Sequence, residues 1–371
     1  MELILNGLAL TTSDTAPITC NKSTEVTIVA AAGTVNTLTD STYNNDDNYP
    51  DNANAENAVI KTKDGSVVTI CGTGTINVIA KGKNGVKGGA TTETEGTARL
   101  TIKEVTLNIT CTANDGLKSD QELNILSGNI TISAVDDGIK SDYVLNIGAN
   151  GTDGPTINVT KSYEGIEAAT LNVYSGNITV HSTDDGMNAA NSDLTGYAFS
   201  LSIYGGTLYI DAANGDGLDS NGTMTLAGGT IEVHASSRND NSPLDSDRTM
   251  ALTGGTVIAI GSNGMAQTPN SASQPYLSIG AGGQGGPGGG GPGGGGPGGP
   301  GGPGQPGQPG SSISIAAGDS IVIKDAGGNV LYSTTAVRAA NYVFFSSAAL
   351  VSGQTYTLYI NGTSAASVTA R

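Results

Sequence analysis

The chain has 371 residues, of which 13% are charged, with 56 glycines, no tryptophan and a net charge of −17. This acidic balance argues against nucleic acid or an anionic membrane as a partner and favours divalent cations. No stretch approaches the roughly 18 apolar residues of a membrane-spanning helix, and the abundance of Thr, Asn, Ser, Val and Ile predicts strands and tight turns.

The first hundred residues contain short runs in which apolar and polar residues alternate: LILNGLAL, STEVTIVAA, SVVTICG and TINVIA. Alternation with a period of two predicts strands with one buried face. A polar segment rich in Asn and Asp, residues 41–57, interrupts these runs and is expected to be a surface loop. No signal peptide is visible, and we expect the open edge of the first strand to be covered by further residues or by a partner.

From residue 114 to residue 247 one acidic phrase recurs six times. The phrases are NDGLKSD (114–120), DDGIKSD (136–142), YEGIEAA (163–169), DDGMNAA (184–190), GDGLDS (215–220) and NSPLDSD (241–247), with a weaker copy at 83–87. Between them lie pairs of alternating runs that align without gaps, such as LNILSGNITISA, LNVYSGNITVHS and LSIYGGTLYIDA. Self-similarity at a period of roughly 20–30 residues is typical of stacked repeats. Because each repeat holds only short strands and turns, the pattern predicts a parallel β-helix.

Three parts are predicted along the chain. Residues 1–280 form the parallel β-helix, and residues 281–310, almost pure Gly and Pro, form a loop or linker. Residues 311–371 resume alternating runs around an Asp-Ala-Gly-Gly-Asn hairpin turn and are predicted to be a small β unit that packs on the helix. The predicted fold class is therefore all-β, a solenoid with a small C-terminal β unit.

Aligned on their central glycine, the phrases place an acidic residue in the preceding position five times in succession: Asp115, Asp137, Glu164, Asp185 and Asp216. If the phrases stack, like charges ~5 Å apart repel by on the order of 3 kcal/mol at an effective dielectric constant near 20. Either the carboxyl pKa values rise or cations bind. Oxygen ligands in a glycine-containing loop favour Ca²⁺, and the candidate ligands are Asp115, Asp136, Asp137, Glu164, Asp184, Asp185, Asp216 and Asp219. The alternative is that these Asp residues are turn formers that cap backbone amides.

Two residues after the glycine, a second column starts with Lys87, Lys118 and Lys140 and becomes acidic or neutral in the later repeats. A lysine beside bound calcium can act as the base of a β-elimination on an acidic sugar, or it can simply neutralise neighbouring carboxylates, which we favour. Zinc is disfavoured because His181 and His234 are isolated and lack cysteine neighbours.

Tyrosines supply the flat rings that could contact sugar faces. Tyr174 and Tyr204 occupy the same position before the turn in two aligned repeats, so they are expected to stack, and Tyr163 lies beside the acidic column. Together with Lys118 and Lys140, these three tyrosines are the candidate substrate-binding residues; no catalytic residue is assigned.

The phrase DDGIKSD followed by LNI and SGNITI resembles the clostridial carbohydrate-binding β-helix family. So do YEGIEA, the opening LILNG with DTAPI, and the closing IVIKDAGGNV with GQTYTL. The resemblance implies a right-handed parallel β-helix, calcium in the acidic turns, and secreted proteins that bind cellulose and polygalacturonate. It also implies an architecture shared with pectate-type polysaccharide lyases. Position by position it carries calcium binding onto Asp115, Asp136, Asp137, Asp184, Asp185 and Asp216. Two departures are Glu164, which breaks the Asp-Asp pattern, and Pro243, which replaces the glycine of the last phrase.

The leading hypothesis is a secreted, calcium-binding, non-catalytic protein that binds cellulose or acidic pectin-type glycans outside the cell or at its surface. One alternative is a calcium-dependent polysaccharide lyase with Lys118 or Lys140 as base. The other is a structural or adhesive protein that self-associates through the solenoid ends or the Gly/Pro-rich segment.

Overall fold

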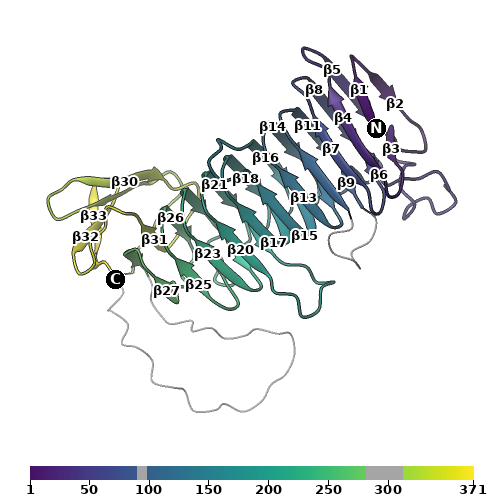
Figure 1. The fold of residues 1–371 in the computed structure, drawn as a ribbon. Helices are drawn as coiled ribbons and strands as arrows, with labels where there is room; N and C mark the ends of the chain where they lie inside the picture. Colours follow the sequence, from purple (N-terminus) through teal and green to yellow (C-terminus); the bar gives the residue numbers. More distant parts are fainter. Residues whose placement is uncertain (90–97, 281–311) are drawn as a thin grey trace.

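Parallel strands stack along one axis and give the chain an elongated, ladder-like shape in the computed structural model (Figure 1). The structure describes residues 1–89, 98–280 and 312–371, so the predicted Gly/Pro segment 281–310 lies outside the described residues. All regular elements in the described residues are strands, which confirms the all-β solenoid. No helix long and apolar enough to cross a membrane occurs in those three stretches.

The first sheet has 17 strands and bends so that most coils contribute two stretches to it. One row carries the acidic phrases: β3 (Ile18–Cys20), β6 (Ala58–Thr62), β9 (Asn84–Gly88), β12 (Leu117–Ser119), the start of β15 (Ile139–Ile147), the start of β17 (Ile166–Val173), β19 (Met187–Ala189) and β22 (Leu218–Ser220). The row beside it contains β1 (Glu2–Leu5), β4 (Glu25–Ala30), β7 (Val67–Cys71), β10 (Arg99–Ile102), β13 (Glu122–Ile125), the ends of β15 and β17, β20 (Ser200–Ile203), β23 (Thr223–Leu226), β25 (Met250–Leu252) and β27 (Ser271–Ala272).

The second sheet has 12 strands and forms the opposite wall. Its strands are β2 (Ala9–Thr11), β5 (Val35–Thr39), β8 (Thr75–Ala80), β11 (Thr106–Cys111), β14 (Asn129–Ser133), β16 (Thr156–Ser162), β18 (Asn177–Ser182), β21 (Thr207–Ala212), β24 (Thr230–His234), β26 (Thr256–Gly261), β31 (Tyr342–Ser346) and β28 (Tyr276–Ile279). Apolar residues that alternate along the strands of both sheets point inward, and each inward position repeats from coil to coil. The resulting core is a set of apolar columns, of which Leu117, Ile139, Ile166 and Leu218 are fully buried members.

Glycines allow two features of each coil. At the corners between the sheets, Gly128, Gly176 and Gly206 have φ angles of 102°, 123° and 95°, a region that side-chain-bearing residues rarely adopt. The central glycines of the phrases are needed for another reason. A Cβ on Gly186 would lie 2.2 Å from Ile210 Cγ2 and 2.5 Å from the Gly217 carbonyl oxygen, so only glycine lets the neighbouring coil approach this closely.

The C-terminal residues end the solenoid in two ways. Strand β31 lies between β26 and β28 and pairs antiparallel with both. The four-stranded antiparallel sheet of β29 (Ser320–Lys324), β30 (Val330–Thr335), β32 (Thr355–Ile360) and β33 (Thr363–Thr369) shares a second apolar core with these last strands, including Ile258, Ile279 and Phe345. The edge of the second sheet is thereby covered by the chain itself.

Both histidines lie on the outer face of the second sheet near this C-terminal sheet, and neither is isolated as the sequence suggested. His234 is buried, and its Nε2 lies 2.9 Å from Glu232 Oε1, while Glu232 Oε2 accepts a hydrogen bond from Tyr332. His181 Nδ1 lies 3.2 Å from Asp211, which also pairs with Arg338. Their neighbours are carboxylates and rings, so the histidines belong to the contact with the C-terminal sheet.

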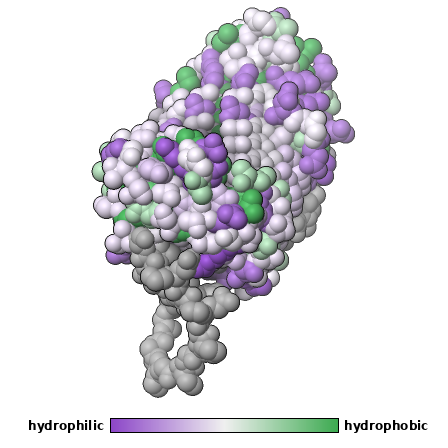
Figure 2. All heavy atoms as spheres, turned by 90° about the vertical axis from the view of Figure 1, so that its left-hand side faces the viewer, coloured by the Kyte–Doolittle hydropathy of each residue, from purple (hydrophilic) through white to green (hydrophobic). Residues whose placement is uncertain are grey.

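The surface at the C-terminal end of the molecule is mostly polar. Figure 2 shows pale and purple residues along the face turned toward the viewer, with only small, separate green patches. Such a face offers hydrogen-bonding groups rather than an apolar docking surface.

Candidate functional site

The acidic phrases stack in register, as predicted. Leu117 pairs with Ile139, Ile139 with Ile166, and Met187 with Leu218. The amide of each central glycine donates to the carbonyl oxygen of the column residue on the next coil, for example Gly138 to Glu164 at 3.0 Å. The residues before the glycines therefore form one continuous acidic column, defined here as Asp115, Asp137, Glu164, Asp185 and Asp216, with one residue per strand spacing of about 4.8 Å.

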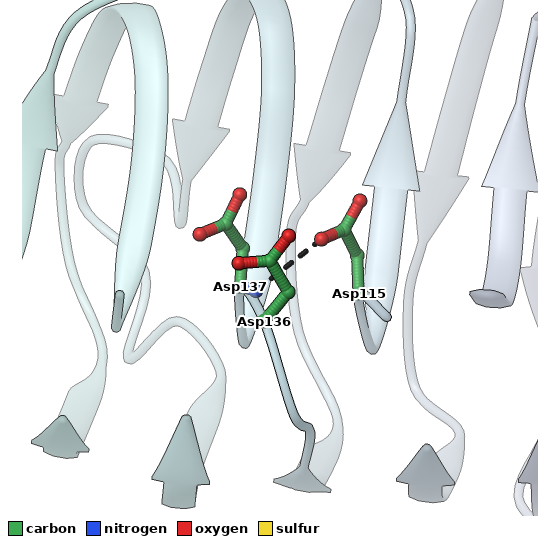
Figure 3. A group of neighbouring side chains, drawn as sticks. All are labelled: Asp115, Asp136 and Asp137. Atoms are coloured by element: carbon green, nitrogen blue, oxygen red, sulfur yellow. Dashed lines mark hydrogen bonds between the residues drawn. The ribbon is translucent and has the colours of Figure 1, made fainter. Parts of the chain in front are cut away.

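One oxygen of several column carboxylates is used within the column itself. The amide of Asp137 donates to Asp115 Oδ1 at 3.2 Å, as Figure 3 shows, and the amide of Asp216 donates to Asp185 Oδ1 at 2.7 Å. The amide of Ser242 donates likewise to Asp216. The interpretation of these residues as backbone caps is therefore correct for one oxygen each. The other oxygen of Asp115 and of Asp216 can interact with a cation, whereas Asp185 Oδ2 accepts a hydrogen bond from the Asn188 side chain.

In the earlier coils that cation is lysine. Lys140 Nζ lies 2.7 Å from Asp137 Oδ2 and 2.9 Å from Glu167 Oε1. Lys118 Nζ lies 3.7–3.8 Å from Asp115, Asp120 and Asp142. Partial burial by itself would lower the pKa of Lys140, but the two carboxylates outweigh it and raise that pKa above its usual value. Neutralisation by lysine, the favoured interpretation, describes this half of the column.

In the later coils the second column contains no lysine. Within the described residues, no Lys or Arg forms an ion pair with Glu164, Asp185, Asp216, Asp219 or Asp245. Burial is the main reason that the pKa of Asp185 rises to about 6 and that of Asp216 to about 8, and neighbouring carboxylates add to the rise. Burial, followed by the hydrogen bond and charge of Glu167, raises the pKa of Glu164 to about 10. With these pKa values Glu164 and Asp216 hold protons at neutral pH unless a cation replaces them, whereas Asp185 is largely ionised.

Three groups of carboxylate oxygens lie within 4.8 Å of one another: Asp115, Asp136 and Asp137; Asp137, Glu164 and Glu167; and Asp216, Asp219 and Asp245. Figure 3 shows the first group, with carboxylates from two neighbouring coils side by side. Six of the eight predicted metal ligands fall in these groups. Asp184 and Asp185 do not, because Asp185 bonds to the Asp216 amide and to Asn188, while Asp184 lies beside Tyr163. Glu167 and Asp245 complete two of the groups and were not among the predicted ligands, although both lie in the second column of the repeat.

Three buried oxygens in the later coils have no hydrogen-bond partner among the described residues: Ser162 Oγ, Glu164 Oε2 and Asn188 Oδ1. Asn188 stands in the column of Lys140, between Glu167 and Asp219, and its Nδ2 donates to Asp185 Oδ2 at 3.2 Å. A buried acceptor without a partner costs free energy, so these atoms indicate a ligand that donates or a cation. The oxygen-only donor set of Asp216, Asp219 and Asp245 suits a hard divalent ion such as Ca²⁺.

The predicted substrate-binding residues are dispersed over the solenoid. Tyr174 and Tyr204 stack as expected, with ring centroids 5.2 Å apart and planes 9° apart, and Tyr204 is exposed. Tyr163 is exposed at the rim of a surface hollow beside the later part of the acidic column. Lys118 and Lys140 are mostly buried among carboxylates. The structure does not bring the five residues into one site.

The sequence matches a known protein family over most of its length. Residues 1–169 and 144–274 match the family described as carbohydrate-binding domain-containing protein. These two matches together span well over half of the chain. The chain belongs to this family. No curated protein and no solved structure matches it.

Membership in a carbohydrate-binding family supports a polysaccharide as the partner and suggests a binding role rather than catalysis. The hollow beside Tyr163 was missed from the sequence because two of its residues, Arg238 and Asp240, lie in an irregular segment without a repeat signal.

Proposed function

We propose that the protein is a secreted, non-catalytic polysaccharide-binding protein whose acidic column binds Ca²⁺. Its ligands would be cellulose and acidic pectin-type glycans. Because such polysaccharides lie outside cells, an extracellular or cell-surface location follows from the same proposal. Family membership supports the polysaccharide part.

The calcium part is carried by one observation, the two unpartnered buried oxygens of Glu164 and Asn188 in the half of the column that lacks lysine. Asp216, Asp219 and Asp245 would hold the ion, because their oxygens already lie within 4.8 Å of one another. Bound Ca²⁺ supplies positive charge, which neutralises the carboxylates and attracts uronate groups to a protein of net charge −17.

The lyase alternative receives less support. A base that abstracts a proton must be neutral at working pH, but the carboxylates around Lys118 and Lys140 outweigh partial burial and raise the pKa of both ammonium groups. We therefore assign no catalytic role to either lysine. Assembly through the solenoid ends or the Gly/Pro-rich segment is a separate hypothesis, and that segment lies outside the described residues.

Calcium binding is tested by titrating Ca²⁺ into chelator-treated protein in a calorimeter and by melting the protein with and without EDTA. At Ca²⁺ one hundred times above its dissociation constant, binding stabilises the folded state by about 2.7 kcal/mol, so EDTA is expected to lower the melting temperature by several degrees. Asp216→Asn and Asp219→Asn are expected to weaken Ca²⁺ binding at least tenfold. The matched control Asp51→Asn, in an exposed turn, leaves it unchanged. Equal Ca²⁺ affinity in all four proteins would refute the assignment.

Polysaccharide binding is tested by sedimentation with insoluble cellulose and pectin, with and without Ca²⁺. We expect the protein in the pellet, and for acidic pectin only when Ca²⁺ is present. Protein that stays in the supernatant with both polymers contradicts the proposed function. If unsaturated sugars are released, which ultraviolet absorbance detects, the protein is a lyase and the proposed non-catalytic function is wrong.

A further inference from the structure

A hollow of about 570 Å³ lies on the outer surface next to the later part of the acidic column. Its lining includes Tyr163, Asp184, Asn214, Arg238, Asp240 and Asn241. The volume is within the range of about 300–1,000 Å³ that is usual for small-ligand sites. None of these residues belongs to the three carboxylate groups described above.

The shape of the hollow comes from the repeat. Tyr163, Asp184, Gly215 and Asn241 each precede the acidic-column position of their own coil, so they form a neighbouring column. Gly215 contributes no side chain to it, and a Cβ there would lie 2.4 Å from Asp185 Oδ1. Tyr163, Asp184 and Asn241 of this column line the hollow, together with Asn214, the residue before Gly215. An irregular turn that carries Arg238 and Asp240 supplies one wall.

The lining has the chemistry of a sugar site. Tyr163 is 48% exposed, and its hydroxyl lies beside Asp184, which raises the pKa of that hydroxyl. The exposed ring is a flat apolar surface for the C–H face of a pyranose. Among the described residues, the side chain of Asn214 has no hydrogen-bond partner, and it is available to sugar hydroxyls.

The charge of the lining selects the kind of sugar. Arg238 is held by Asp240 through two hydrogen bonds, of 3.1 and 2.7 Å, and is therefore already neutralised. Asp184 therefore remains as the net charge of the lining. A uronate carboxylate would meet repulsion here, whereas hydroxyl groups find acceptors and amide donors.

We propose that this hollow is a subsite for a neutral hexopyranose unit of a polysaccharide, with Tyr163 as the stacking platform and Asp184 and Asn214 as hydroxyl partners. This inference rests on the proposed polysaccharide-binding function and adds to it a location and a sugar class. The calcium-binding carboxylates would then attract acidic chains at one place while neutral chains bind at another.

The test measures binding of cellohexaose, a neutral glucose oligomer, and of trigalacturonate by calorimetry. Tyr163→Ala is expected to weaken cellohexaose binding at least tenfold, while Tyr163→Phe, which keeps the ring, stays within about threefold of the wild type. Tyr43→Ala is the matched control, because that ring is also exposed, at 55%, but lies outside the hollow, and it is expected to leave affinity unchanged. Saturation-transfer NMR on the wild type should show the sugar C–H protons close to the protein.

Two results would overturn the subsite while leaving the proposed function intact. One is wild-type affinity for cellohexaose in Tyr163→Ala. The other is loss of trigalacturonate binding in Tyr163→Ala with cellohexaose binding unaffected, which would give the hollow to acidic sugars. Failure of the proposed function looks different, because the wild type would then bind neither oligomer and would not sediment with either polymer.

Discussion

The two halves of the acidic column carry the same phrase on the same backbone but neutralise it differently. Around Asp115 and Asp137 the protein provides its own cations, Lys118 and Lys140, whereas around Asp185 and Asp216 it provides none. The later half instead has unpartnered oxygens, while burial raises carboxyl pKa values in both halves. A repeated acidic motif therefore predicts a need for positive charge but not where that charge comes from. Its source differs from coil to coil and depends on whether the second column carries a lysine.

The largest expected effect comes from removing the internal cation. Lys140→Met leaves Asp137 and Glu167 facing each other without compensation and is expected to reduce the free energy of unfolding by about 2–4 kcal/mol. The value is below that of a fully buried pair because the ammonium keeps some contact with water. Urea denaturation measures this loss of stability, with Lys161→Met, a substitution of an exposed lysine, as control. A loss below about 1 kcal/mol would mean that the lysine is dispensable and that the two halves do not differ.

The converse change introduces a lysine into the later half of the column. Asn188→Lys places an ammonium at the position equivalent to Lys140, between Glu167 and Asp219, and is expected to stabilise the calcium-free protein by about 1–2 kcal/mol. It should also abolish most of the melting-temperature change caused by EDTA, since the lysine competes with the ion. Asn188→Gln, which adds no charge, should do neither. A less stable lysine variant that still responds fully to EDTA would contradict this account.

The pH dependence of stability reports the buried carboxyl groups, and one substitution then isolates the contribution of the later half. In the folded protein the pKa of Asp185 is about 6 and that of Asp216 about 8, both raised by burial, so the folded state keeps protons that the unfolded state loses near pH 4. Folded-state proton binding that exceeds unfolded-state binding makes stability fall as pH rises. In EDTA, the free energy of unfolding should therefore decrease from about pH 4 to pH 8.

Asp216→Asn should flatten this decrease, because an amide does not ionise, while Asp51→Asn should not. Melting curves in EDTA at unit steps of pH measure both. The earlier half contributes as well, because burial raises the pKa of Asp137 to about 7, so only the difference between Asp216→Asn and the wild type belongs to the later half. Stability that increases with pH over the window would be the opposite of what the burial of these carboxyl groups requires.

The smallest expected effect is at an exposed ion pair on one of the earlier coils. Arg99 Nε lies 2.9 Å from Glu122 Oε2, but half of the arginine side chain is exposed. Arg99→Ala is expected to cost less than about 1 kcal/mol by urea denaturation, because water already screens such a pair. A cost equal to that of Lys140→Met would mean that burial does not explain the importance of the internal lysines.

Much of the fold could be predicted from the sequence for local reasons. Alternation of apolar and polar residues defines which face of a strand is buried, and the repeated glycines align one coil with the next. The stacking of the acidic phrases and of Tyr174 on Tyr204 follows from that alignment alone. Strand β31 could not be placed this way, because its position between β26 and β28 depends on a contact with strands more than 60 residues away.

The candidate site was predictable as a column but not as a set of partners. The sequence by itself determined the order of carboxylates and lysines along the solenoid. Strands that alternate with a period of two, joined by a recurring phrase, can pair in only one register that buries the apolar face. Only the tertiary structure decided which side chains are in contact. It shows that Lys140 pairs with both Asp137 and Glu167 and that one oxygen of Asn188 has no partner. It also shows that Arg238 lines a hollow beside Tyr163. Such contacts depend on side-chain length, burial and irregular turns in neighbouring coils, and these carry no periodic signal.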